Sequence, residues 1–70
     1  MRLFINGSQK DVPEPSTGGL TAKSLLDILQ LKPESVAFEL NLEIVPKKEY
    51  DSQLLKEGDK IEIISFVGGG

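Results

Sequence analysis

Three consecutive glycines, Gly68, Gly69 and Gly70, end the sequence directly after a run of β-branched and aromatic residues. Glycine has no side chain to pack and loses the most conformational entropy on folding, so we expect the folded part to end near Val67. The reactive group at this end is the α-carboxylate of Gly70, which is ionised at neutral pH because its pKa is about 3.5. A segment without Cβ atoms can enter a narrow channel, so the glycines predict a flexible arm that presents a carboxylate to a partner.

The rest of the chain offers few side chains that could perform catalysis. It contains no cysteine and no histidine, which removes disulfides, the usual metal ligands and the usual general base. We therefore expect no metal site, no enzyme active site and no cofactor bound by the chain itself. A simple linker or a frayed terminus is an alternative interpretation of the glycines that composition alone leaves open.

Length and composition indicate one small soluble domain. Seventy residues, of which 39% are hydrophobic and 27% charged, bury only a thin core and leave no room for a large cofactor pocket. The net charge of −3 and the lack of a basic cluster beyond Lys47-Lys48 argue against nucleic acid or anionic membranes as partners and favour a basic protein surface. Neither a membrane span nor a signal peptide is recognisable, so we expect a cytoplasmic protein.

The elements that must position the glycine end form a simple order along the chain. We expect a strand at 2–5, an Asn6-Gly7 turn, a polar edge strand at 8–12, a helix from 22 to about 31, strands at 35–40 and 43–45, a helical turn within 51–55 and a last strand from 60. This order predicts an α+β domain in which one helix packs across a small mixed sheet. Residues 1–67 would form the domain and residues 68–70 its flexible tail.

The helix is predicted from the spacing of its apolar residues. Apolar residues recur at the i, i+3, i+4 and i+7 positions of one helix face: Ala22, Leu25, Leu26 and Leu29. Ile28 widens this apolar stripe. Thr21 is the expected N-cap, with its hydroxyl accepting a hydrogen bond from the N–H of Ser24. Pro33 disfavours helical geometry at the residue before it, so the helix is expected to end near Leu31.

Part of a phosphate-binding loop is resembled by four residues: Gly18, Gly19, Lys23 and Ser24. Such a loop has glycine directly before its lysine, where this chain has Ala22. We therefore favour an exposed loop followed by a lysine on the helix surface.

The last strand changes its apolar phase. Ile61 and Ile63 share one face with Ser65, whereas Ile64 and Phe66 fall on the opposite face. A β-bulge would return Ile64 and Phe66 to the core, and regular pleating would leave them on the open face as a docking surface. The sequence leaves both alternatives open.

Four segments carry a resemblance to a known family: 41–47 (Asn-Leu-Glu-Ile-Val-Pro-Lys), Tyr50, 55–63 (Leu-Lys-Glu-Gly-Asp-Lys-Ile-Glu-Ile) and 66–70 (Phe-Val-Gly-Gly-Gly). With these segments the chain closely resembles the ThiS family, the sulfur carriers of thiamine biosynthesis, over essentially its whole length. Many relatives have Asn-Gly where this chain has Asn41-Leu42. Because leucine tolerates a positive φ poorly, the geometry of that turn is not predicted.

The resemblance implies a ubiquitin-like β-grasp fold and a function located at Gly70. The Gly70 carboxylate would be adenylated by a ThiF-like enzyme, which uses ATP, and then converted to a thiocarboxylate with sulfur from a donor enzyme. Gly68 and Gly69 would thread into the partner, and the sulfur would pass to a thiazole synthase. Two alternatives remain: a ubiquitin-like protein modifier, and a sulfur carrier of the molybdopterin-synthase type.

The implied fold also suggests which residues dock the partners. A β-grasp fold pairs its first and last strands in parallel, which would bring Phe4 beside Ile64 and Phe66. Phe4 is out of phase with Leu3 and Ile5, as expected of a residue on the open face. We therefore expect these three side chains to form the docking surface for the activating enzyme and the synthase.

Overall fold

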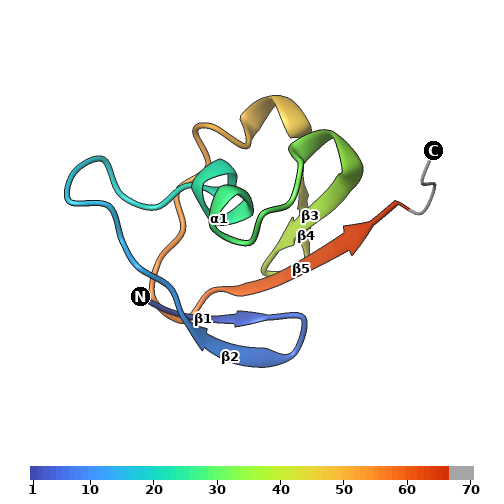
Figure 1. Ribbon diagram of the computed structural model, residues 1–70. Helices are drawn as coiled ribbons and strands as arrows, with labels where there is room; N and C mark the ends of the chain where they lie inside the picture. The colour runs from blue at the N-terminus through green and yellow to red at the C-terminus, as the bar shows by residue number, and fades with distance from the viewer. Residues whose placement is uncertain (67–70) are drawn as a thin grey trace.

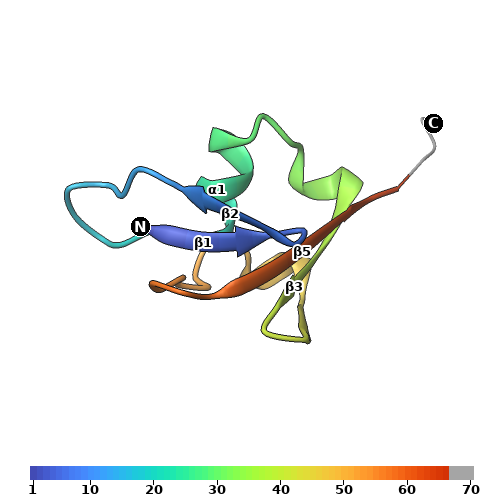
Figure 2. The same cartoon turned by 90° about the horizontal axis from the view of Figure 1, so that it is seen from below.

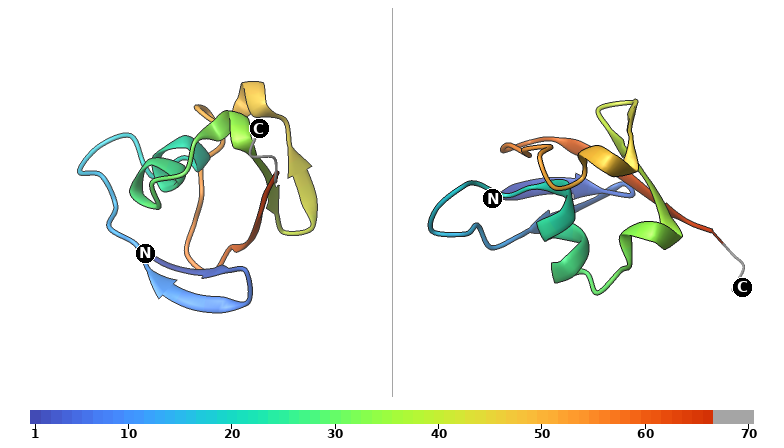
Figure 3. Two further views of the ribbon diagram at one scale, coloured as in Figure 1. Left: turned by 45° about the vertical axis from the view of Figure 1, so that its right-hand side comes forward. Right: turned by 90° about the horizontal axis from the view of Figure 1, so that it is seen from above.

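Two hairpins flank the last strand in a five-stranded sheet. The computed structural model describes residues 1–66, and within them lie β1 (Arg2–Ile5), β2 (Ser8–Asp11), α1 (Ala22–Ile28), η1 (Pro33–Ser35), β3 (Val36–Leu40), β4 (Glu43–Val45), η2 (Lys47–Glu49) and β5 (Lys60–Ser65). The strand order is β2-β1-β5-β3-β4, with β5 parallel to β1 and antiparallel to β3 (Figures 1 and 3). The expected small mixed sheet with one helix across it is confirmed.

Both hairpins turn through two residues with positive φ. The φ values are 51° and 84° for Asn6 and Gly7, and 52° and 73° for Asn41 and Leu42. This pairing of signs is that of a type I′ turn, the connection that matches the twist of the flanking strands. The Asn41-Leu42 turn therefore places a leucine where glycine would be free of steric cost.

The helix begins and buries its apolar face as predicted. Thr21 caps it, with Oγ1 accepting a hydrogen bond of 3.1 Å from the N–H of Ser24. Ala22, Leu25 and Leu26 are buried against the sheet. The predicted start of the helix is confirmed. This prediction depended only on the cap residue and on the spacing of the apolar residues after it.

The helix ends earlier than predicted. Its last residue is Ile28, and Gln30 takes a positive φ of 62°. The N–H of Leu31 donates to Leu26 O at 2.9 Å and the N–H of Gln30 donates to Asp27 O at 3.0 Å, which is the pattern of a Schellman motif. The predicted end near Leu31 was wrong because this motif ends the helix before Pro33 can. Ile28, expected to widen the buried stripe, is 43% exposed.

The core lies between α1 and the inner face of the sheet. Fourteen hydrophobic residues form it: Leu3, Ile5, Val12, Leu20, Ala22, Leu25, Leu26, Val36, Phe38, Val45, Tyr50, Leu55, Ile61 and Ile63. The rings of Phe38 and Tyr50 lie 5.8 Å apart, and the Tyr50 hydroxyl donates to Val36 O at 3.2 Å. Burial raises the pKa of Tyr50, whose phenol keeps its proton for this hydrogen bond.

The segment between β4 and β5 contains one correction to the prediction. The helical turn expected within 51–55 lies upstream, in η2, directly after Pro46. Pro46 is the N-cap residue of η2, with φ −60° and ψ 144°, and its missing N–H is not needed at this position. Leu55 is buried, whereas Leu54 is exposed.

The face of the sheet opposite α1 is open to solvent among the described elements (Figure 2). It is called the outer face below. Within residues 1–66 no helix is long and apolar enough to cross a membrane.

Candidate functional site

Two exposed apolar side chains, one on β5 and one directly after it, precede the glycine end in the sequence. Ile61 and Ile63 are buried, whereas Ile64 is 51% exposed and Phe66, just after the strand, is 57% exposed. The pairing of β5 with β3 runs through five consecutive residue pairs without interruption. The bulge alternative is therefore wrong, and regular pleating places Ile64 on the outer face.

Phe4 lies on the same outer face but at a different level of the sheet. In the parallel pairing of β1 with β5 it stands opposite Lys60. Lys60 precedes Ile64 by four positions, or roughly 13 Å along the strand. Phe4 is half-buried. The structure thus brings Ile64 and Phe66 close together in the chain's last described stretch and sets Phe4 apart from them.

Two neighbours of this site were not found from the sequence. Ala37 stands directly opposite Ile64 in the β3 and β5 pairing, and Ile44 stands opposite Glu39 in the β3 and β4 pairing. Ala37, Ile64 and Phe66 are called the outer patch below. Ile44 was missed because a three-residue strand is too short for alternation to show which face each residue takes.

Two carboxylates lie beside the outer patch. Glu39 and Glu62 are direct partners in the antiparallel pairing of β3 with β5, so both project from the outer face. Like charges directly opposite each other repel, so this pair reduces stability while concentrating negative charge beside Ile64. The outer face therefore combines exposed apolar area with an acidic border, which suits a basic protein surface.

The buried carboxylate of the chain has a structural role. Asp59 is 4% exposed and accepts hydrogen bonds from Asn41 Nδ2 at 3.0 Å and from the Lys56 N–H at 2.8 Å. Burial would raise the pKa of Asp59, but these hydrogen bonds and the Lys56 ammonium, 3.2 Å away, bring it below its ordinary value. Asn41 Oδ1 also accepts from the Lys60 N–H at 3.0 Å. Asp59 and Asn41 together hold the β3 and β4 hairpin turn against the start of β5.

The residues that suggested a phosphate-binding loop form ordinary contacts at the protein surface. Lys23 Nζ forms an ion pair with Asp27 at 3.1 Å, and the Ser24 hydroxyl lies 2.9 Å from that of Thr21, so the polar groups of the suggested phosphate loop are engaged within the helix. Within residues 1–66 no group of three His, Cys, Asp or Glu side chains is arranged to hold a metal ion.

Gly68, Gly69 and Gly70 lie outside the described residues, as does Val67. Their predicted threading into a partner and the reaction at the Gly70 carboxylate therefore stay predictions. In the sequence, Phe66 of the outer patch is followed by Val67 and then by the three glycines.

The chain is similar to a family model, to a protein sequence and to a solved structure. The model of the ThiS family matches residues 3–70. A sulfur carrier protein ThiS from Bacillus subtilis is 43% identical over 68 residues, covering 97% of this chain and 98% of that protein. The crystal structure of the thiamine biosynthesis protein ThiS from Geobacter metallireducens superimposes with a TM-score of 0.80 at 34% identity, covering all of both chains.

Longer proteins also contain a matching stretch. A thiazole synthase from Paramagnetospirillum magneticum is 41% identical over 70 residues, and one from Magnetococcus marinus is 37% identical over 70 residues. The match covers all of this chain but only 20% of each synthase. The chain therefore spans about a fifth of the length of these two relatives.

Proposed function

The chain belongs to the ThiS family, and from this membership we propose that it carries sulfur for thiamine biosynthesis as a thiocarboxylate formed at Gly70. It is a small carrier protein and not a catalyst. The observation that carries the proposal is the family match, which extends over residues 3–70 and so includes the terminal glycines. The β-grasp architecture shared with the solved ThiS structure supports it.

The proposed chemistry converts a poor acyl donor into a reactive one. A carboxylate oxygen of Gly70 attacks the α-phosphate of ATP in a ThiF-like enzyme, and pyrophosphate leaves. Sulfur delivered by a donor enzyme at the oxidation level of sulfide then attacks the acyl carbon, and AMP departs with one of the original carboxylate oxygens. The net change at Gly70 is the replacement of one oxygen by sulfur, and all catalytic groups and the ATP site belong to the partners.

The recipient of the sulfur is proposed to be a thiazole synthase. This is supported by the two synthases that contain a stretch similar to the whole of this chain. A carrier stretch and a synthase within one polypeptide fit a role in which the two act together.

Docking is proposed to use the apolar side chains that precede the glycines. Ile64 and Phe66 are exposed beside the acidic pair Glu39 and Glu62, and Phe4 extends the same face further along β5. Apolar contact beside the tail would orient Gly70 in the partner's site, and the carboxylates would steer the encounter with a basic partner.

The intact mass of the chain tests the proposal. After incubation with ATP, a ThiF-like enzyme and a sulfur donor, we expect the gain in mass of one oxygen-for-sulfur exchange. Deletion of Gly70, or one residue appended after it, should abolish the gain while leaving the circular dichroism and the melting temperature unchanged. Retention of the gain in the extended variant, or isopeptide-linked conjugates in its place, would overturn the proposal.

A further inference from the structure

β4 is an open edge of the sheet. It is last in the strand order and pairs only with β3. Leu40 and Glu43 flank a two-residue turn with positive φ at both positions, and residues that flank such a turn hydrogen-bond to each other. The alternation of an antiparallel ladder then turns the N–H and C=O of Ile44 away from β3. Ile44 is 72% exposed and Leu42 is 91% exposed, the highest values among large apolar side chains in residues 1–66. β4 thus offers a backbone donor, a backbone acceptor and apolar area to another strand.

The opposite edge of the sheet is protected against such pairing. β2 is polar and exposed along its whole length, and Pro13 and Pro15 follow it. Polar edge residues and proline are the usual means by which a sheet avoids adding strands. β4 has Pro46 after it but no lysine or arginine within it.

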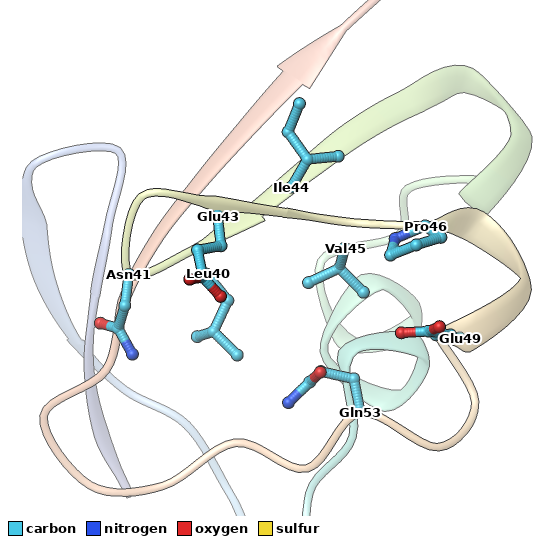
Figure 4. A pocket seen from close by; sticks show the side chains of 8 residues that line it. All are labelled: Leu40, Asn41, Glu43, Ile44, Val45, Pro46, Glu49 and Gln53. Carbon is cyan, nitrogen blue, oxygen red and sulfur yellow. The ribbon is translucent and has the colours of Figure 1, made fainter.

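A hollow of about 380 Å³ lies beneath β4, between this strand and residues 49–53 (Figure 4). Its apolar lining comes from Leu40, Ile44, Val45 and Pro46, and its polar lining from Asn41, Glu43, Glu49 and Gln53. Ile44 borders the hollow, but Figure 4 shows its side chain on the other side of the strand. Side chains of an added strand that face inward beside Glu43 and Val45 would therefore enter this hollow.

The polar lining selects positively charged side chains. Glu43 and Glu49 are exposed, and neither carboxylate has an ion-pair or hydrogen-bond partner among residues 1–66. Gln53 Nε2 donates to Leu54 O at 3.1 Å, so the group that it can offer to a ligand is its carbonyl oxygen. An ammonium or guanidinium group would satisfy these acceptors. An apolar or acidic occupant would instead cover the carboxylates of Glu43 and Glu49 and leave both without a partner.

We propose that β4 binds an extended segment of a partner protein in which an apolar residue is flanked on both sides by lysine or arginine. The residue that hydrogen-bonds opposite Ile44 projects from the same face as Ile44, which requires an apolar side chain there. Its two neighbours project into the hollow, where Glu43 and Glu49 require cations. A second copy of this chain fits less well, because the neighbours of Ile44 in its own β4 are Glu43 and Val45, neither of which brings a cation into the hollow.

This site does not depend on sulfur transfer. The proposed reaction occurs at Gly70 and the proposed docking there uses the outer patch, neither of which includes the β4 backbone or the hollow. A variant that loses the strand site is therefore expected to keep the oxygen-for-sulfur mass gain, and the two proposals can fail separately.

Short peptides test the strand geometry and the charge preference. We would titrate the ¹⁵N-labelled chain with three peptides of equal length that differ at the centre: Lys-Val-Lys, Glu-Val-Glu, and Lys-Val-Lys with an N-methylated valine. The first should shift the amide resonances of Glu43, Ile44 and Val45 in a saturable way. The acidic and the N-methylated peptides should bind at least about tenfold more weakly, because one lacks the cations and the other lacks the backbone donor. Equal binding of the three, shifts located elsewhere, or no binding of any would overturn the proposal.

Two substitutions and a matched control test the hollow itself. Glu43→Gln combined with Glu49→Gln should weaken binding of the Lys-Val-Lys peptide by about fivefold, with the fold intact because both side chains are exposed. Asp11→Asn on β2 removes one exposed carboxylate from the opposite edge and should leave the affinity unchanged. An equal loss in the Asp11→Asn variant, or binding of lysine amide as tight as that of the peptide, would contradict a strand site at β4.

Discussion

The side chain of Asn6 pairs with the backbone of Ile63 in both directions. Asn6 Oδ1 accepts from the Ile63 N–H at 2.7 Å, and Asn6 Nδ2 donates to Ile63 O at 3.2 Å. The backbone pairing of β1 with β5 reaches Ile5 and Ile61, beyond which β1 turns away through Asn6-Gly7. The Asn6 amide therefore continues the parallel ladder by two more residues of β5, where the last strand would otherwise lack a partner on this side.

Asn6→Gly should lower the free energy of unfolding by about 1–2 kcal/mol, because the Ile63 backbone loses both partners. Glycine adopts the positive φ of this turn without strain, so the loss reports on the amide and not on the turn. The measurement is urea denaturation. A midpoint equal to that of the parent chain would show that the two hydrogen bonds add nothing to stability.

Leu42→Gly should raise the free energy of unfolding by roughly 0.5–1 kcal/mol, because glycine relieves the strain of a positive φ and the leucine side chain buries almost no area. The control is Leu54→Gly, at a leucine that is also exposed but has no positive φ. That change should lower stability. Thermal unfolding of both variants measures the difference, and a loss of stability at both positions would contradict the strain at Leu42.

Asp59 should make stability depend on pH below neutrality. Its pKa is lowered in the folded state, so its contribution is fully present above the unfolded pKa of about 3.9 and is lost as the pH falls through the folded pKa. Asp59→Asn should therefore lower the free energy of unfolding by about 1–2 kcal/mol at neutral pH. The difference between the two chains should shrink in acid. Urea midpoints of both chains over a pH series check this, and two parallel curves would be the contrary result.

Ile64→Ser should change the free energy of unfolding by less than about 0.5 kcal/mol, because the side chain is half exposed on the outer face. Binding to the activating enzyme should weaken by about 1 kcal/mol or more, as expected of a central interface residue. Ile28→Ser, at an exposed isoleucine on the helix side, is the matched control and should leave binding unchanged. Calorimetric titration that finds equal losses for the two variants would exclude a specific role of the outer patch.

Gly69→Val should slow adenylation sharply without changing the stability of the domain. A valine side chain at this position would occupy space that the partner's channel is proposed to leave only for a backbone. Release of pyrophosphate in the presence of the ThiF-like enzyme measures the rate. Gln9→Val, which adds the same side chain on exposed β2, should adenylate at the parent rate. A normal rate for Gly69→Val would mean that the channel is wide.

Much of this protein could be predicted from local features of its sequence. The Asn6-Gly7 turn, the Thr21 cap and the alternation in β3 each depend on a few adjacent residues, whose φ preferences and side-chain hydrogen bonds act within one turn of chain. The same holds for the absence of cysteine and histidine, which limits the chemistry to other groups whatever the fold. The choice of Gly70 as the reactive position also came from the sequence, and it stays a prediction.

The tertiary structure decided the features that depend on distant partners. Ile64 is exposed because β3 pairs with β5 in unbroken register, and Phe4 lies apart from it because the parallel ladder sets Phe4 opposite Lys60. Ile44 is placed on the outer face of the sheet only by its pairing with Glu39. A strand's local sequence specifies that its side chains alternate, but the face and the level of each are set by the register with strands that are far away in the chain.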